Sequence, residues 1–348
     1  MKIFYSDVHF QHNPSFEIFD GGVKVPNFEM PERAERILHA LHQTSWAAIH
    51  NPDDFGLEPI LAVHDAGYID FLSSAYAEWQ MIDTDTPYEK DALLPASFPP
   101  GKWRHIPKTL LGRAGYYMSD LSAPITAGTY PAALAAVNCA LSAAEIVLAG
   151  EKSSFALSRP PGHHAGKANC GGYCYINNAA VAANWCSRHR KTALLDIDYH
   201  CGNGTQDIFY DRSDVLTISI HADPDDEYPY FCGYSDEMGT GNGTGYHRNF
   251  PLPSGTDNKH YLAALGQALE LVNSFDAELL VISAGMDLYA GDPLGKFNVT
   301  RDGIRQIGAQ ISSLGLPCLI VMEGGYNNAA LGENIVTLLE TFENTPPA

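Results

Sequence analysis

Residues 194–204 read LLDIDYHCGNG, an apolar run that ends in two aspartates and a histidine at alternate positions. Successive side chains of a β-strand point to opposite faces, so Asp196, Asp198 and His200 are expected to project to one side. Ile197 and Tyr199 are expected to project to the other side. The stretch therefore predicts a strand whose edge carries two carboxylates and an imidazole.

Apolar runs with strand character alternate with helical patterns along the chain. The strand-like runs are KTALLDID (191–198), DVLTISI (214–220), AELLVISAGMD (277–287) and LPCLIVMEGG (316–325), and helical periodicity marks residues 177–190 and 260–275. This alternation predicts an α/β fold, with a mostly parallel multi-stranded sheet flanked by helices on both faces. Ligands of such folds bind outside the carboxyl ends of the strands. Three of the runs end in DIDYH, SAGMD and MEGGY, which is where we expect the site.

We expect residues 1–348 to form a single domain, because no internal repeat, low-complexity tract or linker interrupts the chain. The proline-rich segment at about 84–108 lacks periodicity and is predicted to be an insertion loop. Loops of this length inside a compact domain are usually functional or disordered.

Composition excludes several classes of protein. The chain has 41 acidic and 21 basic residues, a net charge of −20, which argues against nucleic-acid binding and is compatible with a cationic partner. Its seven cysteines include no C-x-x-C pair, so neither a disulfide framework nor a cysteine zinc knuckle is expected. The N-terminus lacks a signal-peptide pattern, and no stretch approaches roughly 18 uninterrupted apolar residues. We therefore expect a cytoplasmic protein that does not bind membranes.

The opening stretch has the residue types of a metal site. Asp198 and His200 could supply two ligands of a divalent cation, and Asp287, at the end of another apolar run, could supply a third. An unpaired carboxylate among apolar neighbours would be costly. Any one of these aspartates could instead cap a helix or pair with an arginine, but for the set a metal is the better hypothesis.

Two further motifs carry candidate catalytic groups. SRPPGHHAG (158–166) presents His163 and His164 side by side; such a pair is more often a solvated turn, but near a metal it suggests a general acid and base. In MEGGYN (322–327), two glycines precede Tyr326, whose hydroxyl could donate to an oxyanion. A loop tyrosine taken alone is more often structural.

Together these motifs carry a resemblance. The order SRPPGHHAG, GGYCYINN, LLDIDYHCGNGTQDIFY, SAGMD and MEGGYN resembles the metal-dependent deacetylase family on the arginase-like fold, specifically its acetylpolyamine amidohydrolase branch. EMPERAERI (29–37) and LAVHDAGYIDFL (61–72) are also similar to that branch, so the likeness is nearly full length. It implies one catalytic domain that binds one Zn²⁺, with Fe²⁺ as a possible native metal, and needs no organic cofactor.

The resemblance also assigns roles to residues. Asp198, His200 and Asp287 would bind zinc, His163 and His164 would be the tandem histidines, and Tyr326 would polarise the carbonyl. Asp196 would contact His163 instead of zinc. A structural K⁺ or Na⁺ is implied at Asp196, Asp198, His200 and Ser219, and a second near Phe209, Arg212 and Val215.

Two residues depart from the family pattern. Cys201 replaces a histidine that often follows the ligand, which leaves the role of this side chain open. Asn203 stands where some members carry an aspartate that faces the second tandem histidine. A neutral partner raises the pKa of an imidazole less than a carboxylate does, so we expect His164 to be the base and His163 an electrostatic or relay partner.

Substrate choice is expected to come from a channel. Tyr173 and Tyr228 match positions where the family places aromatic walls around a linear alkyl chain, with Gly172 beside the first, although both tyrosines could be loop packing. Glu17 is a candidate carboxylate at the mouth for a distal ammonium. The acidic run Asp225, Asp226 and Glu227 either adds to the negative electrostatic field that would attract a cationic substrate or is simply a solvated face.

The resulting hypothesis is zinc-dependent hydrolysis of acetylated polyamines such as acetylputrescine, acetylcadaverine or longer amines, giving acetate and a free amine. An acetyllysine peptide deacetylase would use the same catalytic residues behind an open mouth. By resemblance, the insertion at about 84–108 narrows the entrance and supports a homodimer. An arginase-like ureohydrolase would need more aspartates and histidines for two metals, and a noncatalytic metal-dependent binding protein ranks last.

Overall fold

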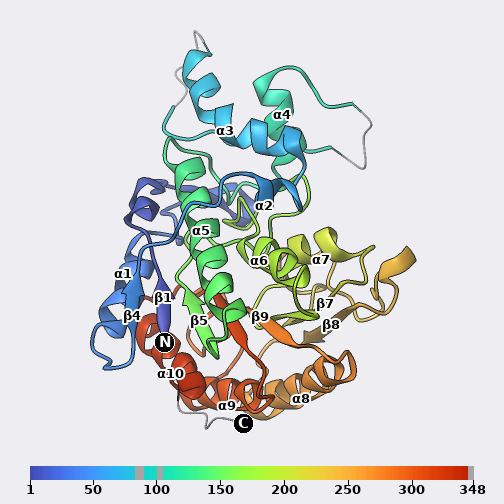
Figure 1. Cartoon of the computed structure of the whole chain (residues 1–348). Coiled ribbons are helices and arrows are strands. Elements are labelled where there is room, and N and C mark those ends of the chain that lie inside the picture. The colour runs from blue at the N-terminus through green and yellow to red at the C-terminus, as the bar shows by residue number, and fades with distance from the viewer. Residues whose placement is uncertain (83–89, 100–104, 344–348) are drawn as a thin grey trace.

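The computed structural model describes residues 1–82, 90–99 and 105–343 (Figure 1). In this part of the chain, eight strands form one sheet in the order β4-β1-β5-β10-β9-β6-β7-β8. The strands are β1 (Lys2–Phe4), β4 (Ala48–His50), β5 (Ser153–Ala156), β6 (Thr192–Asp196), β7 (Val215–Ala222), β8 (His247–Leu252), β9 (Leu279–Ala284) and β10 (Cys318–Met322). Every neighbouring pair in this sheet is parallel, which confirms the predicted α/β fold. The predicted insertion at 84–108 lies partly outside the described residues.

Helices cover both faces of the sheet. One apolar cluster joins the sheet to α3 (Ala66–Met81), α4 (Leu110–Tyr117), α5 (Thr129–Leu148) and α6 (Asn178–Ser187). A second cluster joins the opposite face to α1 (Glu32–Leu41), α8 (Asn258–Ser274), α9 (Arg301–Ser312) and α10 (Leu331–Glu343). In Figure 1, α3 and α4 lie at one end of the molecule and α8, α9 and α10 at the other.

Shorter elements complete the fold. They are the helices α2 (Glu58–Leu61) and α7 (Asn203–Phe209) and the antiparallel pair β2 (Glu17–Phe19) and β3 (Val23–Val25). Three 3₁₀ turns span Asp7–Gln11, Asp20–Gly22 and Gly241–Gly243. The β2–β3 pair stands apart from the main sheet.

Burial on both faces explains why the strands read as continuous apolar runs. On β6, Leu194 packs with the α5–α6 side, whereas Ala193 and Leu195 pack with the α8–α9 side. On β9, Val281 packs with the α5–α6 side and Ile282 packs with the α8–α9 side. A parallel sheet with two covered faces favours apolar side chains on both sides of each strand, and β6 and β9 supply them at most positions.

The strand in the opening motif is shorter than predicted. β6 ends at Asp196, and the chain bends through residues 197–200. The Asp196 carboxylate accepts the backbone N–H of Asp198 at 3.0 Å, and Asp198 accepts that of His200 at 2.8 Å. Such local side-chain bonds to the backbone compete with a strand ladder and turn the chain. Ile197 and Tyr199 nevertheless pack on the opposite face, as the alternation predicts.

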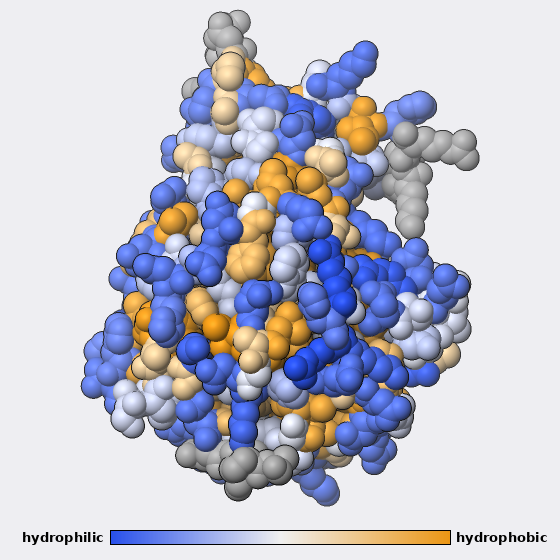
Figure 2. Space-filling view, viewed as in Figure 1, coloured by the Kyte–Doolittle hydropathy of each residue, from blue (hydrophilic) through white to orange (hydrophobic). Residues whose placement is uncertain are grey.

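Helix α5 is long and apolar enough to cross a membrane by length and composition alone, but 61% of its most apolar window is buried inside the protein. The helix packs against α6, β5, β1 and β10. Burial in the core therefore accounts for its composition. On the face shown in Figure 2, hydrophilic residues surround separate apolar patches.

His64, which follows α2, is a buried histidine that needs to remain neutral. Its Nδ1 lies 2.8 Å from the carbonyl oxygen of Gly166, and its Nε2 accepts the N–H of Asn177 at 3.0 Å. Burial lowers the pKa of His64 from 6.5 to about 4. The unfolded chain therefore binds this proton more readily, so stability present above pH 6.5 is lost as the pH falls toward 4.

We expect the free energy of unfolding to depend less on pH in His64→Asn than in the parent protein, by about 1.4 kcal/mol per pH unit between pH 6 and 4.5. Urea denaturation at pH 7.5, 6.0 and 5.0 measures this difference. His39→Asn, an exposed position on α1, is the matched control and should keep the parent's pH dependence. Parallel curves for the parent and His64→Asn would contradict the assignment.

Candidate active site

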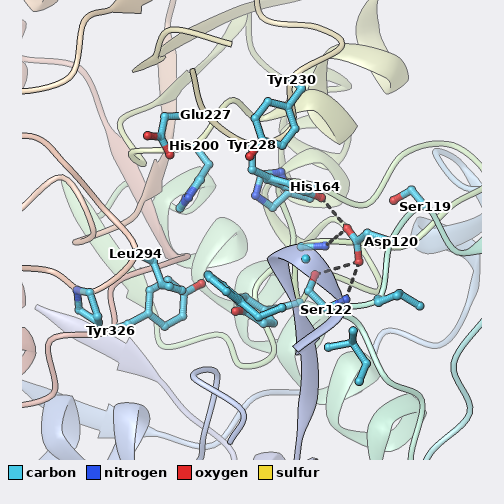
Figure 3. A pocket seen from close by; sticks show the side chains of 18 of the residues that line it. Ser119, Asp120, Ser122, His164, His200, Glu227, Tyr228, Tyr230, Leu294 and Tyr326 are labelled. Atoms are coloured by element: carbon cyan, nitrogen blue, oxygen red, sulfur yellow. Dashed lines mark hydrogen bonds between the residues drawn. The ribbon is translucent and has the colours of Figure 1, made fainter. Parts of the chain in front are cut away.

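A cavity of about 570 Å³ lies outside the carboxyl ends of the strands (Figure 3). Among the residues that line it are His164, Gly172, Tyr173, His200, Tyr228 and Tyr326. These residues come from the four segments that follow β5, β6, β7 and β10. The tertiary structure thus brings the predicted tandem-histidine, aromatic and tyrosine motifs to one cavity.

At the base of this region, Asp198, His200 and Asp287 offer ligand atoms that all lie within 4.8 Å of one another. His200 Nδ1 is 3.1 Å from Asp287 Oδ2 and 3.4 Å from Asp198 Oδ1. Both aspartates are fully buried. A Cβ on Gly285 would lie 1.8 Å from Asp198 Oδ2, so only glycine leaves room for this carboxylate. The structure therefore brings the three predicted ligands close enough together to hold one metal ion.

The charges of this group fit a divalent cation. Burial raises the pKa of Asp287, and the nearby Asp198 raises it further. Burial also opposes a charge on His200, yet Asp198 and Asp287 raise the pKa of this imidazole to about 10. Two carboxylates and one imidazole attract a positive charge, and they are a donor set that suits zinc or iron. The residues present therefore fit the metal that the family implies.

The tandem histidines lie against this group. Their ring centroids are 3.9 Å apart, and both rings are buried. His163 Nδ1 is 3.0 Å from Asp196 Oδ2, and its Nε2 is 3.7 Å from Asp198 Oδ1. Burial opposes a charge on His163, but Asp198 and Asp196 raise its pKa well above 6.5. These carboxylates favour the protonated ring, and its Nδ1–H donates to Asp196 Oδ2.

His164 has the opposite electrostatic environment. Burial lowers the pKa of His164 well below 6.5, and the positive charges of His163 and His200 add to the effect. The neutral ring donates its Nδ1–H to Asn203 Oδ1 at 2.6 Å. Nε2 is then the unprotonated nitrogen, which can accept a proton.

Tyr326 lies on the loop after β10. Its backbone N–H donates to Asp292 Oδ2 at 2.7 Å, and the Arg33 guanidinium lies 4.7 Å from the centre of its ring. Burial raises the pKa of Tyr326 well above 10. The hydroxyl therefore keeps its proton at neutral pH and can donate a hydrogen bond.

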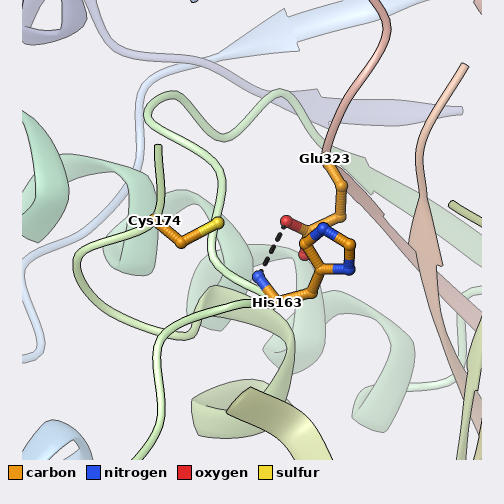
Figure 4. Close-up of side chains that lie close together, drawn as sticks. All are labelled: His163, Cys174 and Glu323. Atoms are coloured by element: carbon orange, nitrogen blue, oxygen red, sulfur yellow. Dashed lines mark hydrogen bonds between the residues drawn. The ribbon is translucent and has the colours of Figure 1, made fainter. Parts of the chain in front are cut away.

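A second group, His163, Cys174 and Glu323, also places possible ligand atoms within 4.8 Å of one another (Figure 4). Glu323 Oε2 accepts the backbone N–H groups of Gly162 at 2.7 Å and His163 at 3.1 Å. Burial raises the pKa of Cys174 well above 9, so the thiol stays protonated and is a poor metal ligand. Glu323 thus braces the tandem-histidine loop.

A tight turn presents Tyr173 to the cavity. Gly171 and Cys174 exchange backbone hydrogen bonds of 3.2 and 2.8 Å across it. Gly172 has φ +52° and Tyr173 has φ +65°, the positive values that a type I′ turn requires. A Cβ on Gly172 would lie 2.3 Å from His164 Cδ2, so glycine is needed at this position. Tyr173 is held in a conformation that non-glycine residues rarely adopt.

Asp120 connects this turn to the other predicted aromatic residue. Its Oδ2 accepts the Tyr228 hydroxyl at 2.7 Å (Figure 3). The same oxygen accepts the Gly172 N–H at 2.8 Å. The Tyr228 ring meets His164 edge-on at 4.9 Å between centroids. Asp120 therefore fixes one wall of the cavity, and no local pattern in the sequence indicated this role.

The prediction that Glu17 lies at the cavity mouth is wrong. Its side chain is fully buried, and Oε1 accepts the N–H of Phe28 at 3.1 Å. Burial raises the pKa of the Glu17 carboxylate to about 7, although its neighbour Tyr173 lowers it in part. Glu17 therefore supports the tyrosine from behind and does not face a ligand.

A family model described as the histone deacetylase domain matches residues 27–342. The chain belongs to this family. It is 45% identical over 344 residues to acetylpolyamine amidohydrolase 1 of Pseudomonas aeruginosa, which covers 97% of this chain and 98% of that protein. It is 41% identical over 343 residues to the acetylpolyamine amidohydrolase of Mycoplana ramosa, covering 98% and 99%.

The fold agrees with these sequence matches. A crystal structure of acetylpolyamine aminohydrolase from Burkholderia pseudomallei gives a TM-score of 0.93 at 37% identity and covers 99% of both chains. As a member of the deacetylase family, the protein is a hydrolase that acts on amides.

The residues predicted to hold monovalent cations in this deacetylase lie near the metal group or on the adjoining α7–β7 segment. Ser219 on β7 pairs with Asp196 on β6, and its Oγ lies 2.7 Å from His221 Nδ1. The carbonyl of Phe209 accepts the N–H of Arg212 at 2.9 Å, and Val215 begins β7. Cys201 is buried, and the neighbouring Cys232 raises the pKa of its thiol well above 9.

Other residues that hold the deacetylase site were not identified from the sequence. Arg33 donates to the carbonyls of Gly325 at 2.7 Å and Glu323 at 2.6 Å, and also to Glu29 at 2.8 Å. Glu323 ends a buried strand, the same signal that identified Asp287. The spacing of Glu29 and Arg33 is that of a helical ion pair, which gives no indication of a contact with the tyrosine loop.

We expect Asp287→Ala to lose tight binding of a divalent metal, because two remaining protein ligands do not fix its geometry. Elemental analysis of protein purified after zinc loading measures the metal per chain. Asp120→Asn, which lines the same cavity outside the metal group, is the control and should keep its metal. One tightly bound zinc in Asp287→Ala would contradict the three-residue assignment.

Proposed function

We propose that this enzyme hydrolyses the acetamide of acetylated polyamines, such as acetylputrescine, acetylcadaverine or longer amines, to acetate and a free amine. The observation that carries the proposal is the meeting of His164, Tyr326 and the metal group at a cavity with aromatic walls. The printed activity of relatives that match this chain over nearly its full length supports the same substrate class.

Asp198, His200 and Asp287 would hold one Zn²⁺ per chain, with Fe²⁺ as the alternative in the cell. The bound cation supplies a Lewis acid next to the amide carbonyl and the attacking water. The three ligands come from two loops that follow buried strands, so they are rigidly placed before the metal arrives.

The protein residues divide the proton transfers between them. Nε2 of neutral His164 removes a proton from the attacking water and later returns it to the leaving amine. His163, held as a cation by Asp196, contributes positive charge beside the reacting group. The protonated Tyr326 hydroxyl donates a hydrogen bond to the oxygen that becomes negative during attack.

The walls of the cavity favour a linear substrate. Tyr173 and Tyr228 line it. Because Gly172 has no side chain, the protein backbone can lie close to the His164 ring. Phe98, a described residue of the predicted insertion, also lines the cavity, which supports a narrowed entrance. An acetylated amine with a slim alkyl chain fits such a channel better than a folded peptide segment does.

Further proposals concern the assembly and the surroundings of the enzyme. We propose that residues 1–348 act as one catalytic domain, that two chains form a dimer, and that the protein works in the cytoplasm. Structural K⁺ or Na⁺ would bind at Asp196, Asp198, His200 and Ser219, and near Phe209, Arg212 and Val215. No nucleic acid or membrane partner is expected, in keeping with the net charge of −20.

The test is acetate release by the zinc-loaded enzyme from a panel of acetylpolyamines and acetyllysine peptides. Faster turnover of the acetylpolyamines supports the proposal. Preference for the peptides would favour an acetyllysine deacetylase. Release from neither class, with metal bound, would favour a binding protein.

We expect His164→Ala and Tyr326→Phe to keep their metal but to lower kcat by roughly 10²–10⁴ for the base and about 10²–10³ for the hydroxyl donor. Steady-state kinetics together with zinc analysis separates these losses from loss of the metal. His163→Ala is the comparison variant. A far larger loss in His163→Ala than in His164→Ala would reverse the assigned roles.

A further inference from the structure

Two carboxylates, Asp120 and Glu227, line the cavity among the residues that the structure describes. Asp120 is fully engaged by the protein. Its Oδ2 accepts Tyr228 and Gly172, and its Oδ1 accepts the N–H of Ser122 at 2.9 Å and its hydroxyl at 2.8 Å. An ammonium from a ligand would have to displace these bonds and loosen the wall that they hold.

Glu227 is engaged differently. Its side chain is 12% exposed and forms an ion pair with the Nζ of Lys296, whose side chain is 61% exposed. Both residues line the cavity, one on the loop after β7 and the other on the loop after β9. Figure 3 shows Glu227 beside His200 and away from Asp120.

The lysine partner shows which ligand this carboxylate accepts. A lysine side chain ends in a primary alkylammonium, the same group that ends a linear polyamine. Because the Lys296 side chain is 61% exposed, its ammonium can move into solvent when another cation binds Glu227. Figure 3 places the carboxylate on the side of the cavity where His200 lies, so a ligand that reaches the metal group passes near it.

We propose that Glu227 binds the distal ammonium of the substrate, and that Lys296 occupies this carboxylate in the free enzyme and yields it to the substrate. The inference rests on the proposed function, since it requires an acetylated amine with a free cationic end. Glu227 is then a specificity-determining residue, and Lys296 competes with the substrate ammonium for the Glu227 carboxylate.

The charges around Glu227 and Lys296 are compatible with replacement of the lysine ammonium by the substrate ammonium. Lys296 also experiences the negative charge of Asp226, so its ammonium keeps an acidic neighbour after it leaves Glu227. The other titratable groups at the cavity are His164, His200 and the tyrosines. The neutral His164 adds no repulsion to an ammonium bound at Glu227.

The experiment compares N-acetyl-1,4-diaminobutane with N-pentylacetamide, which has similar length but no charge. The measured quantity is the ratio of their kcat/KM values at 0.15 M salt, for the parent, Glu227→Gln, Lys296→Met and the double variant. Asp226→Asn is the matched control, because it removes the same charge one residue away without lining the cavity. Thermal melting checks that each variant folds.

We expect Glu227→Gln to lower the ratio by roughly three- to fivefold, the size of one partly exposed ion pair, and Asp226→Asn to change it by less than about twofold. Lys296→Met should raise the ratio by about two- to threefold, and this gain should vanish in the Glu227→Gln background. An equal gain in both backgrounds would show general repulsion by Lys296 and overturn the exchange. Equal effects of Glu227→Gln and Asp226→Asn would overturn the role of Glu227.

A binding measurement separates this inference from the proposed function. If the parent releases no acetate from N-acetyl-1,4-diaminobutane, the proposed function fails. Calorimetry with 1,4-diaminobutane then still tests the exchange, because Lys296→Met must tighten diamine binding and Glu227→Gln must weaken it. Unchanged diamine affinity in both variants would overturn the inference.

Discussion

Three aspartate carboxylates, Asp196, Asp198 and Asp287, are buried at one edge of the sheet, each no more than 1% exposed. Removing one carboxylate from water costs several kcal/mol unless charges and hydrogen-bond donors replace the solvent. The residues around them meet part of this demand: His163 lies against Asp196 and Asp198, and a backbone N–H points at an Asp198 oxygen. A divalent cation held by Asp198, neutral His200 and Asp287 would complete the compensation at this edge of the sheet.

Buried hydrogen bonds also hold the loops that surround these aspartates. Glu323 accepts two N–H groups of the tandem-histidine loop, and the backbone carbonyls of Glu323 and Gly325 accept the guanidinium of Arg33. Asp292 holds the backbone of Tyr326. Each reactive side chain is therefore fixed by a buried bond to another segment. Groups fixed in this way need little reorganisation during a reaction.

The net charge of the whole molecule and the charges inside the cavity have different effects on a cation. The net charge of −20 is a property of the surface as a whole and gives a general attraction for cations. Within the described part of the cavity lining, the carboxylates are Asp120, committed to the wall, and Glu227, paired with a lysine. On the proposed exchange, recognition of a cationic end would depend on this local pair and not on the overall excess of acid.

The sequence by itself determined the parallel sheet and the convergence of DIDYH, SAGMD and MEGGY, because buried strands and strand ends leave local patterns in the residue order. It identified Asp198, His200 and Asp287 as candidate ligands from their places at strand ends. It did not determine that β6 stops at Asp196, since that depends on whether side-chain oxygens take the backbone N–H groups.

Only the tertiary structure decided which polar residues face the cavity. Glu17 is buried behind Tyr173, whereas Asp120 reaches Tyr228 across 108 positions and Glu227 reaches Lys296 across 69. Contacts between such distant residues follow from how the loops pack on the finished sheet. Periodicity and motif spacing describe only neighbouring residues, so they carry no record of these contacts.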